Sequence, residues 1–222
     1  FSTKRPYTTE KDLAPIALFM ANAYVVVARN GLPANNFQEL LAYGHKNPNI
    51  KLTVGNPAIG GAGHLTGELL RTQTRLPMES VPYKTGTQAV GDMVNGQLDL
   101  TIENVSAVLP FIQSGQIKAL AVTSAKRVSV LPQVPTLAES GVPGFDVVAW
   151  GGLVAPVGTP KKAIERLNAA MRKAMAEPAV MGAHGALSVE PMLSSPEEFT
   201  ALVKQETPRW AEVVKRAGVK AD

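Results

Sequence analysis

Short apolar runs alternate with amphipathic segments along most of this chain. Two runs typical of β-strands lie near its start, at residues 16–19 and 24–28. Further strands are predicted at residues 51–54, 78–83, 98–103 and 118–123. Between them, apolar residues spaced for one helical face predict helices at residues 36–45, 64–73, 86–94 and 106–113. Repeated strand–helix–strand order favours a parallel sheet with right-handed crossovers.

The pattern changes after residue 128. Residues 128–144 contain three prolines, which indicates a loop-rich connection with one short helix at 136–140, and residues 146–154 are apolar and extended. A long helix is then predicted at 160–176, with Thr159 as its cap and Pro160 in its first turn. Its expected buried stripe consists of Ile164, Leu167, Met171 and Met175.

A last helix is predicted to open at the sequence Ser195-Pro196-Glu197-Glu198, and Pro208 should kink or split it. The whole pattern predicts an α/β protein with two lobes and mainly parallel sheets. Residues 33–145 are expected to form the second lobe, and residues 1–32 and 146–222 the first. The segments 24–29 and 146–154 would cross between them.

The composition argues against two classes of binding partner, nucleic acids and the membrane interior. The formal net charge is +4, but the 22 Lys and Arg residues are scattered and aromatic residues make up only 5% of the chain. A nucleic-acid binder normally clusters basic residues with aromatic ones, so no nucleic-acid partner is expected. No apolar run has membrane-spanning length, so direct membrane insertion is not expected either. Without cysteines, disulfides and thiolate chemistry are excluded.

The richest candidate site is the glycine-rich turn from Gly55 to His64, between a predicted strand and a predicted helix. Such a turn exposes backbone N–H groups at the positive end of the helix dipole, which suits an anion. The ligand-binding residues predicted here are Ile59, Gly60, Gly61, Ala62, Gly63 and His64. A plain tight turn explains the same glycines equally well.

Three further candidates follow predicted strands. Glu103 and Asn104 lie where the carboxyl ends of parallel strands line ligand crevices, although Asn104 would also serve as a helix cap. Tyr83 precedes the next helix and would wall a pocket, unless it lies on the surface. Trp150 and Trp210 are assigned to the core.

The sequence carries no catalytic constellation such as a nucleophile elbow or HExxH motif. Its three histidines, His45, His64 and His184, are too few and too far apart to suggest a metal site. We therefore expect no enzyme activity, no metal and no cofactor.

With these residues in view, the sequence resembles the Bug-type periplasmic receptors of tripartite tricarboxylate transporters. Segments throughout the chain carry the resemblance, and the most specific lies at residues 119–136. The segments are 7–17, 63–65, 81–84, 96–99, 117–127, 131–136 and 150–156.

The resemblance implies two α/β lobes that close on a small carboxylate and deliver it to membrane permease subunits in the periplasm. It also implies that one loop from each lobe holds the ligand through backbone amides and ordered waters. The loop of the second lobe matches residues 58–64.

Two departures from the family pattern stand out. Family members begin with a strand and a glycine-rich loop that this chain does not match, so the first lobe is expected to be truncated at its N-terminus. The second-lobe loop usually carries hydroxyl residues, whereas this chain has Gly60, Gly61, Ala62 and Gly63. The expected function is a periplasmic receptor for a dicarboxylate or aromatic acid. The alternatives are an α/β enzyme acting on a small carboxylate and a fragment that folds but binds nothing.

Overall fold

The computed structural model describes residues 7–186 and 189–219. The chain divides into two compact units. Unit 1 comprises residues 1–22 and 149–222, and unit 2 comprises residues 23–148. The sequence placed the divisions at 32/33 and 145/146, and the assignment of the two units to receptor lobes stays a prediction.

The sheet of unit 2 is built around strand β1 (Leu13–Arg29). The sequence predicted two separate strands here, but the structure has one strand of 17 residues. The other strands are β2 (Leu52–Asn56), β3 (Met78–Pro82), β4 (Leu100–Asn104) and β5 (Ile117–Val122). Their order across the sheet is β3-β2-β4-β1-β5. Strand β2 is parallel to β3 and β4, whereas β1 is antiparallel to both β4 and β5.

The α/β fold is therefore confirmed with one change, because the sheet is mixed rather than mainly parallel. The residues expected to cross between lobes, from Tyr24 to Arg29, form ladder bonds in the middle of the unit 2 sheet. Strands β2, β3, β4 and β5 all point in one direction and β1 runs against them.

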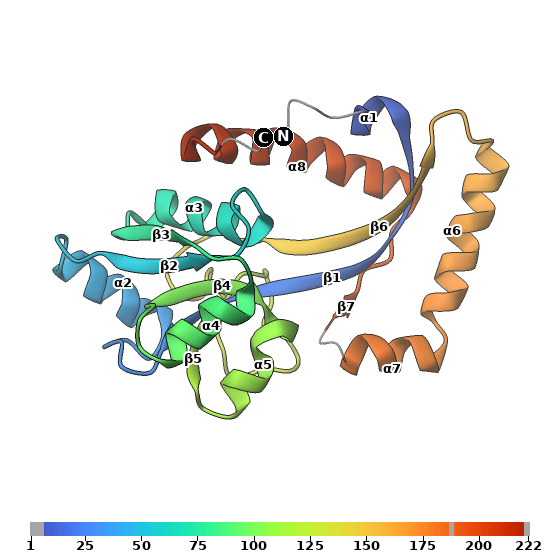
Figure 1. The fold of residues 1–222 in the computed structure, drawn as a ribbon. Coiled ribbons are helices and arrows are strands. Elements are labelled where there is room, and N and C mark those ends of the chain that lie inside the picture. The colour runs from blue at the N-terminus through green and yellow to red at the C-terminus, as the bar shows by residue number, and fades with distance from the viewer. Residues whose placement is uncertain (1–6, 187–188, 220–222) are drawn as a thin grey trace. The chain divides into compact units, whose positions relative to one another are not determined.

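Four helices belong to unit 2: α2 (Phe37–Lys46), α3 (Ala62–Thr74), α4 (Gly86–Val94) and α5 (Val105–Gln113). Helix α3 lies on one face of the sheet and α4 and α5 lie on the other (Figure 1). Val25 and Val27 of β1 share a buried cluster with residues of α4 and α5. Ile102 of β4 points to the opposite face, where its side chain approaches Gly67 of α3.

Most local predictions in unit 2 hold. The side chain of Asn36 accepts a hydrogen bond from the Glu39 N–H and so caps α2, as expected. The helix predicted at 136–140 is wrong, because these residues form a turn. Thr136 instead makes a parallel bridge with Val122, which holds the segment beside β5.

Unit 1 contains the first part of β1 together with six further elements. These are α1 (Thr9–Asp12), β6 (Val148–Pro156), α6 (Lys161–Met175), α7 (Pro178–Ala186), β7 (Glu190–Pro191) and α8 (Pro196–Ala217). Both β6 and β7 pair with β1.

Two details of α6 differ from the prediction. Pro160 occupies the N-cap position, and the Thr159 hydroxyl donates to the Pro156 carbonyl instead of capping the helix. Leu167 is 42% exposed, and the neighbouring Asn168 is buried in its place. The Asn168 amide donates to the carbonyls of Ile16 and Ser194, which explains why a polar residue faces inward.

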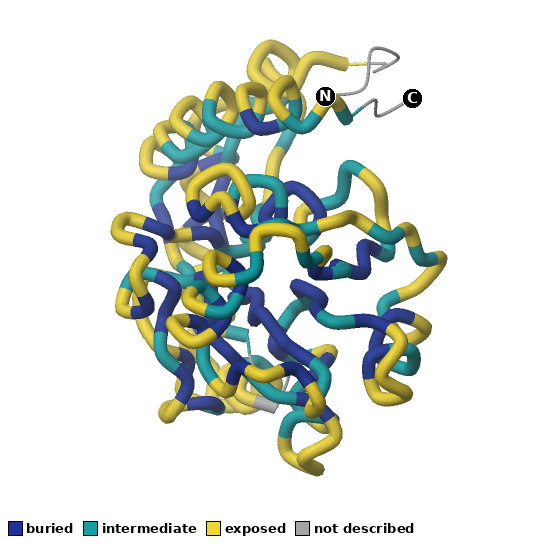
Figure 2. Tube along the Cα trace, turned by 90° about the vertical axis from the view of Figure 1, so that its left-hand side faces the viewer, coloured by how far each residue is buried: buried dark blue, intermediate teal, exposed yellow. Residues whose placement is uncertain are grey.

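Helix α8 opens at the predicted sequence, with a capping box in which Ser195 and Glu198 each accept from the other's backbone N–H. It continues unbroken through Pro208, so the proline does not split it. Phe199 and Val213 are its buried residues, and most of the remaining positions are intermediate or exposed (Figure 2).

Asp99 ties three parts of the unit 2 sheet together at the start of β4. Its Oδ1 accepts from Arg29 Nε of β1 at 2.8 Å. Its Oδ2 accepts from the backbone N–H and the hydroxyl of Thr53 in β2, at 3.0 and 3.1 Å. One partly buried carboxylate thus holds the register of β1, β2 and β4.

We predict that Asp99→Ala lowers the free energy of unfolding by about 2–3 kcal/mol, because charge-assisted hydrogen bonds are lost and Arg29 is left unpaired. The matched control is Glu79→Ala in β3. It breaks the exposed pair with Lys51 and should change stability little. Urea unfolding followed by circular dichroism measures both. Equal effects of the two substitutions would contradict this role of Asp99.

Candidate functional site

The strands β2, β3 and β4 run parallel, and each leads directly to a helix. The starts of α3, α4 and α5 therefore lie along the same edge of the unit 2 sheet. Helix amino ends carry unpaired N–H groups and partial positive charge. This edge is where a ligand site is expected in an open α/β sheet.

The glycine-rich loop before α3 is held in place by its own backbone. Gly60 has a φ of 78°, a conformation that favours glycine, and its N–H donates to His64 Nδ1 at 3.0 Å. The Gly61 N–H donates to the Ala58 carbonyl at 2.8 Å. His64 is buried and so fixes the loop from inside rather than facing outward.

The first turn of α3 has free donors. Gly61 is the N-cap and makes no side-chain cap bond, since glycine has no side chain. The first bond back along the helix runs from the Leu65 N–H to the Gly61 carbonyl. The N–H groups of Ala62, Gly63 and His64 therefore have no acceptor within the helix.

Gly63 is required for close packing of α3 on β4. A Cβ at this position would lie 2.7 Å from the Ile102 carbonyl oxygen, which is closer than real Cβ atoms approach. The glycine thus lets the helix start rest on the sheet edge, and its replacement by proline would disturb the fold as well as any ligand.

Asn104 lies on the same face of the sheet as the α3 loop. Side chains alternate along a strand, so Asn104 points to the face of Ile102, which contacts α3. Asn104 is at the N-cap position of α5 but its side chain makes no cap bond. Its Oδ1 is buried and has no hydrogen-bond partner among the described residues. The amide is thus available to a ligand.

Glu103 points to the opposite face, towards the start of α4. A Cβ on Gly86 would lie 2.9 Å from Glu103 Oε1, so the carboxyl group packs on that helix start. Oε1 is buried and has no hydrogen-bond partner among the described residues. Burial raises the pKa of Glu103, and a hydrogen bond from the Asn104 backbone opposes this in part.

Tyr83 also lies on the α4 face. Its ring packs near Gly55, and its hydroxyl donates to Asp92 Oδ2 of α4 at 2.8 Å. Burial and then the hydrogen bond to Asp92 raise the pKa of Tyr83 to about 12.

The structure thus separates the nine predicted ligand residues. Gly60 to His64 and Asn104 share one face of the sheet edge, and Ile59 is 54% exposed beside them. Glu103 and Tyr83 occupy the other face. Among the described residues, no three His, Asp or Glu side chains are grouped to hold a metal ion. None of the helices in this part of the chain is long and apolar enough to cross a membrane.

The sequence placed Asn56 in the candidate turn but not among the ligand residues, and the structure makes it the last residue of β2. It is buried, and its amide donates to Ser80 Oγ of β3 at 2.8 Å and to the Val54 carbonyl. A polar residue at the end of an apolar strand, just before the glycine-rich turn, was the available signal.

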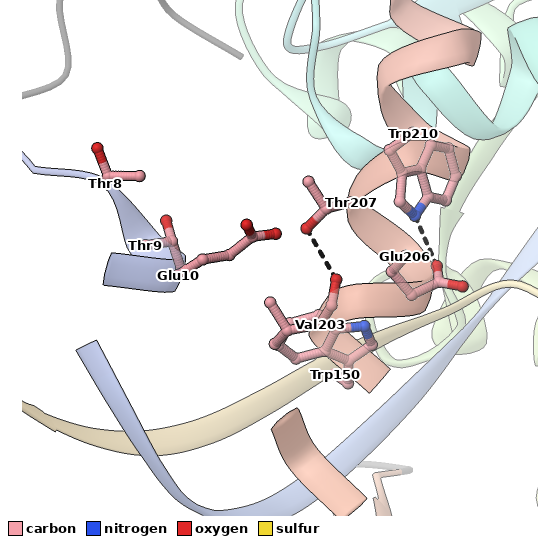
Figure 3. A pocket seen from close by; sticks show the side chains of 8 residues that line it. All are labelled: Thr8, Thr9, Glu10, Trp150, Val203, Glu206, Thr207 and Trp210. Carbon is pink, nitrogen blue, oxygen red and sulfur yellow. Dashed lines mark hydrogen bonds between the residues drawn. The ribbon is translucent and has the colours of Figure 1, made fainter. Parts of the chain in front are cut away.

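Unit 1 has a separate groove of about 350 Å³ between α1, β6 and α8. It is lined by Thr8, Thr9, Glu10, Trp150, Val203, Glu206, Thr207 and Trp210 (Figure 3). Both tryptophans are only partly buried, so their assignment to the core is wrong.

We predict that Asp92→Asn lowers the pKa of Tyr83 towards the ordinary value of 10, because a negative hydrogen-bond acceptor is removed. The measurement is an ultraviolet titration of the phenol, with a Tyr83→Phe variant to isolate its signal. An unchanged titration would mean that the hydroxyl faces solvent or a ligand instead of Asp92.

We also predict a pH-dependent effect of Glu103→Gln. A carboxyl group whose pKa is raised on folding contributes stability at low pH. This contribution is lost as the pH rises through the pKa of the group in the folded protein. The neutral Gln should therefore make the protein more stable at neutral pH, with no difference in acid below the ordinary carboxyl range.

The matched control is Glu139→Gln. Urea unfolding measures the stability of both variants at neutral pH and in acid below the ordinary carboxyl range. Hydrogen bonds from Thr136 and Arg127 lower the pKa of Glu139, so this substitution should destabilise at neutral pH. If both variants change stability in the same direction, burial does not raise the pKa of Glu103.

Comparison with known proteins gives a consistent result. Residues 1–219 match the family described as "Tripartite tricarboxylate transporter family receptor" (TctC). Protein BugT of Bordetella pertussis is 34% identical over 97% of this chain. A UPF0065 protein from the tcbD-tcbE intergenic region of Pseudomonas sp. strain P51 is 35% identical over 96% of it. The chain spans 66% and 64% of these two relatives, less than two thirds of their length.

Solved structures agree with the fold. R. palustris Rpa4515 with adipate has a TM-score of 0.82 and 32% identity, covering 99% of this chain and 73% of that one. MatC from Rhodopseudomonas palustris with bound malate has a TM-score of 0.75 and 30% identity, covering 95% and 72%.

Proposed function

Because the chain belongs to the tripartite tricarboxylate transporter family of receptors, we propose that it binds a small carboxylate at the amino end of α3. In this proposal the protein is a periplasmic solute receptor that passes its ligand to membrane permease subunits. The observation that carries the proposal is the uncapped start of α3, where the N–H groups of residues 62–64 have no acceptor within the helix.

A carboxylate is the group that such a helix start suits best. It carries the negative charge that the helix dipole favours, and its two oxygens can accept several N–H groups at once. The glycine and alanine residues of the loop supply no side-chain hydroxyl, so binding rests on backbone amides. Asn104, on the same face, offers a donor and an acceptor for a second polar group of the ligand.

The ligands of two relatives support a dicarboxylate. The structures named above contain adipate and malate, and both molecules carry two carboxylates. A dicarboxylate would place one carboxylate on the α3 start and leave the other for different contacts. An aromatic acid remains the second candidate from the sequence.

The alternative of an α/β enzyme has less support. It requires a nucleophile with a base in reach. His64 is the histidine beside the loop, and its Nδ1 is occupied by the Gly60 N–H. The residue therefore serves the loop conformation.

The test is Ala62→Pro. Ala62 is exposed and is the first residue of α3, where proline is well tolerated and where the lost N–H has no intrahelical partner. Gly61 has φ −71° and ψ 167°, which a following proline permits. We predict a roughly tenfold loss of affinity for adipate or malate, equivalent to one charge-assisted hydrogen bond.

Ala62→Val is the matched control, because it adds similar bulk and keeps the N–H group. Calorimetric titration with adipate, malate and the neutral adipamide measures the effect. Binding of adipamide as tight as adipate, or equal affinity of the two variants, would overturn the carboxylate site. A wild-type protein that is folded but binds neither acid would favour the fragment that binds nothing.

A further inference from the structure

Two polar side chains lie opposite each other on strands β1 and β4, at the edge of the unit 2 sheet where α3 begins. Tyr24 of β1 is the direct partner of Asn104 of β4 in the antiparallel ladder. Residues paired in this way project from the same face of the sheet, with Cβ atoms about 4.5–5.5 Å apart. Val25, the next residue of β1, packs in the cluster on the α4 face. Tyr24 therefore shares the α3 face with Asn104.

Neither of these side chains is hydrogen-bonded within the part of the chain that the structure describes. Tyr24 is only 5% exposed, and its hydroxyl group makes no hydrogen bond there. Asn104 Oδ1 is buried and unpaired, and the Asn104 side chain makes no cap bond to α5. Buried polar groups normally have partners, because each one left unpaired costs free energy. Two such groups side by side indicate that a ligand group completes them.

The pair is close to the carboxylate site proposed at the start of α3. Gly63, in the first turn of α3, rests on β4, where a Cβ would lie 2.7 Å from the Ile102 carbonyl oxygen. Asn104 follows Ile102 by two residues on the same face, which corresponds to about 7 Å along a strand. A short acid held by the N–H groups of residues 62–64 is therefore within reach of both side chains.

The two side chains together call for a group that both accepts and donates a hydrogen bond. Burial and then the nearby Glu103 carboxyl group raise the pKa of Tyr24, so its hydroxyl keeps its proton and is a donor at neutral pH. Asn104 Oδ1 is an acceptor and needs a donor. A ligand carboxylate would accept from Tyr24 but has no proton for Asn104.

A neutral hydroxyl group meets both requirements, whereas an ammonium group does not. An ammonium group has no lone pair to accept the Tyr24 proton, and burying its charge is costly without a negative partner. The acidic residue adjacent to the pair is Glu103, whose carboxyl group packs on the start of α4 on the other face.

We infer that Tyr24 and Asn104 form a hydroxyl-binding subsite, and that the ligand is a hydroxy acid. The Tyr24 hydroxyl donates to the hydroxyl of the ligand, which in turn donates to Asn104 Oδ1. This inference rests on the carboxylate site proposed above and names the class of acid that fits it. The sequence placed Tyr24 in an apolar strand and not among the ligand residues.

The experiment compares three acids that share one carbon skeleton. Malate carries a hydroxyl group at the carbon where succinate has hydrogen and aspartate has an ammonium group. Calorimetric titration of this protein measures the dissociation constant of each. We expect malate to bind roughly tenfold more tightly than succinate, because without the ligand hydroxyl both buried groups stay unpaired. Aspartate should bind no better than succinate.

Two substitutions test the assigned residues. Tyr24→Phe and Asn104→Leu should each abolish the preference for malate, while the affinity for succinate stays within about twofold because the N–H groups of α3 are retained. Urea unfolding verifies that both variants fold. Asn104→Leu should not lower stability, since it removes an amide whose oxygen is buried and unpaired.

Tyr43→Phe is the matched control, because it removes the same hydroxyl group at a distance from the site. Tyr43 belongs to α2, where the nearby His45 contacts the carbonyl of Thr74, the last residue of α3. The proposed ligand site is at the other end of α3. This variant should keep the full preference for malate.

Four results would overturn the hydroxyl subsite: equal affinity for malate and succinate, tighter binding of aspartate than of malate, a malate preference that survives in either variant, or its loss in Tyr43→Phe as well. In each of them an acid still binds, so the carboxylate site at α3 stands. A folded wild-type protein that binds none of the acids would overturn both proposals together.

Discussion

The second half of β1 determines the organisation of unit 2. It inserts between β4 and β5, against the direction of both, and so occupies the middle of a sheet whose other strands point one way. Thr123 holds the start of this half of β1 in position. Its hydroxyl accepts a hydrogen bond from the Tyr24 N–H at 3.0 Å and donates one to the Val147 carbonyl at 2.7 Å. With β1 in place, the free ends of β2, β3 and β4 and the three helix starts lie along one edge.

Local chemistry explains which elements the sequence predicts well. Helix α4 has the predicted bounds because Thr85 caps its start and Asn95-Gly96 stops it, both effects of neighbouring residues. The short helix predicted at 136–140 fails because Thr136 forms a parallel bridge with Val122 of β5, 14 positions earlier, through hydrogen bonds of the neighbouring Pro135 and Leu137 to Val122. Likewise the polar Asn22 interrupts the apolar pattern of β1, although ladder partners on either side keep it one strand.

The candidate site was predictable in part for the same reason. Glycine spacing before an amphipathic helix is a local signal, and it identified the loop that the structure places at the start of α3. Glu103 and Asn104 are adjacent in sequence, and the predicted strand ended at residue 103. In the structure β4 extends through Asn104, so the two side chains face opposite sides of the sheet. The lack of a hydrogen-bond partner for the buried Glu103 Oε1 and Asn104 Oδ1 among the described residues also depends on tertiary packing, which the sequence alone does not show.

A loop made of glycine and alanine has a consequence for selectivity. Backbone N–H groups at a helix start recognise the charge and geometry of a carboxylate, a feature common to all the candidate acids. Discrimination between acids must then come from side chains that are buried and lose a hydrogen bond when the wrong ligand is present. On the α3 face Asn104 meets that condition, because its Oδ1 is buried and unpaired among the described residues. In the proposed site the loop would provide the affinity for an acid, and Asn104 is the residue on this face suited to distinguish one acid from another.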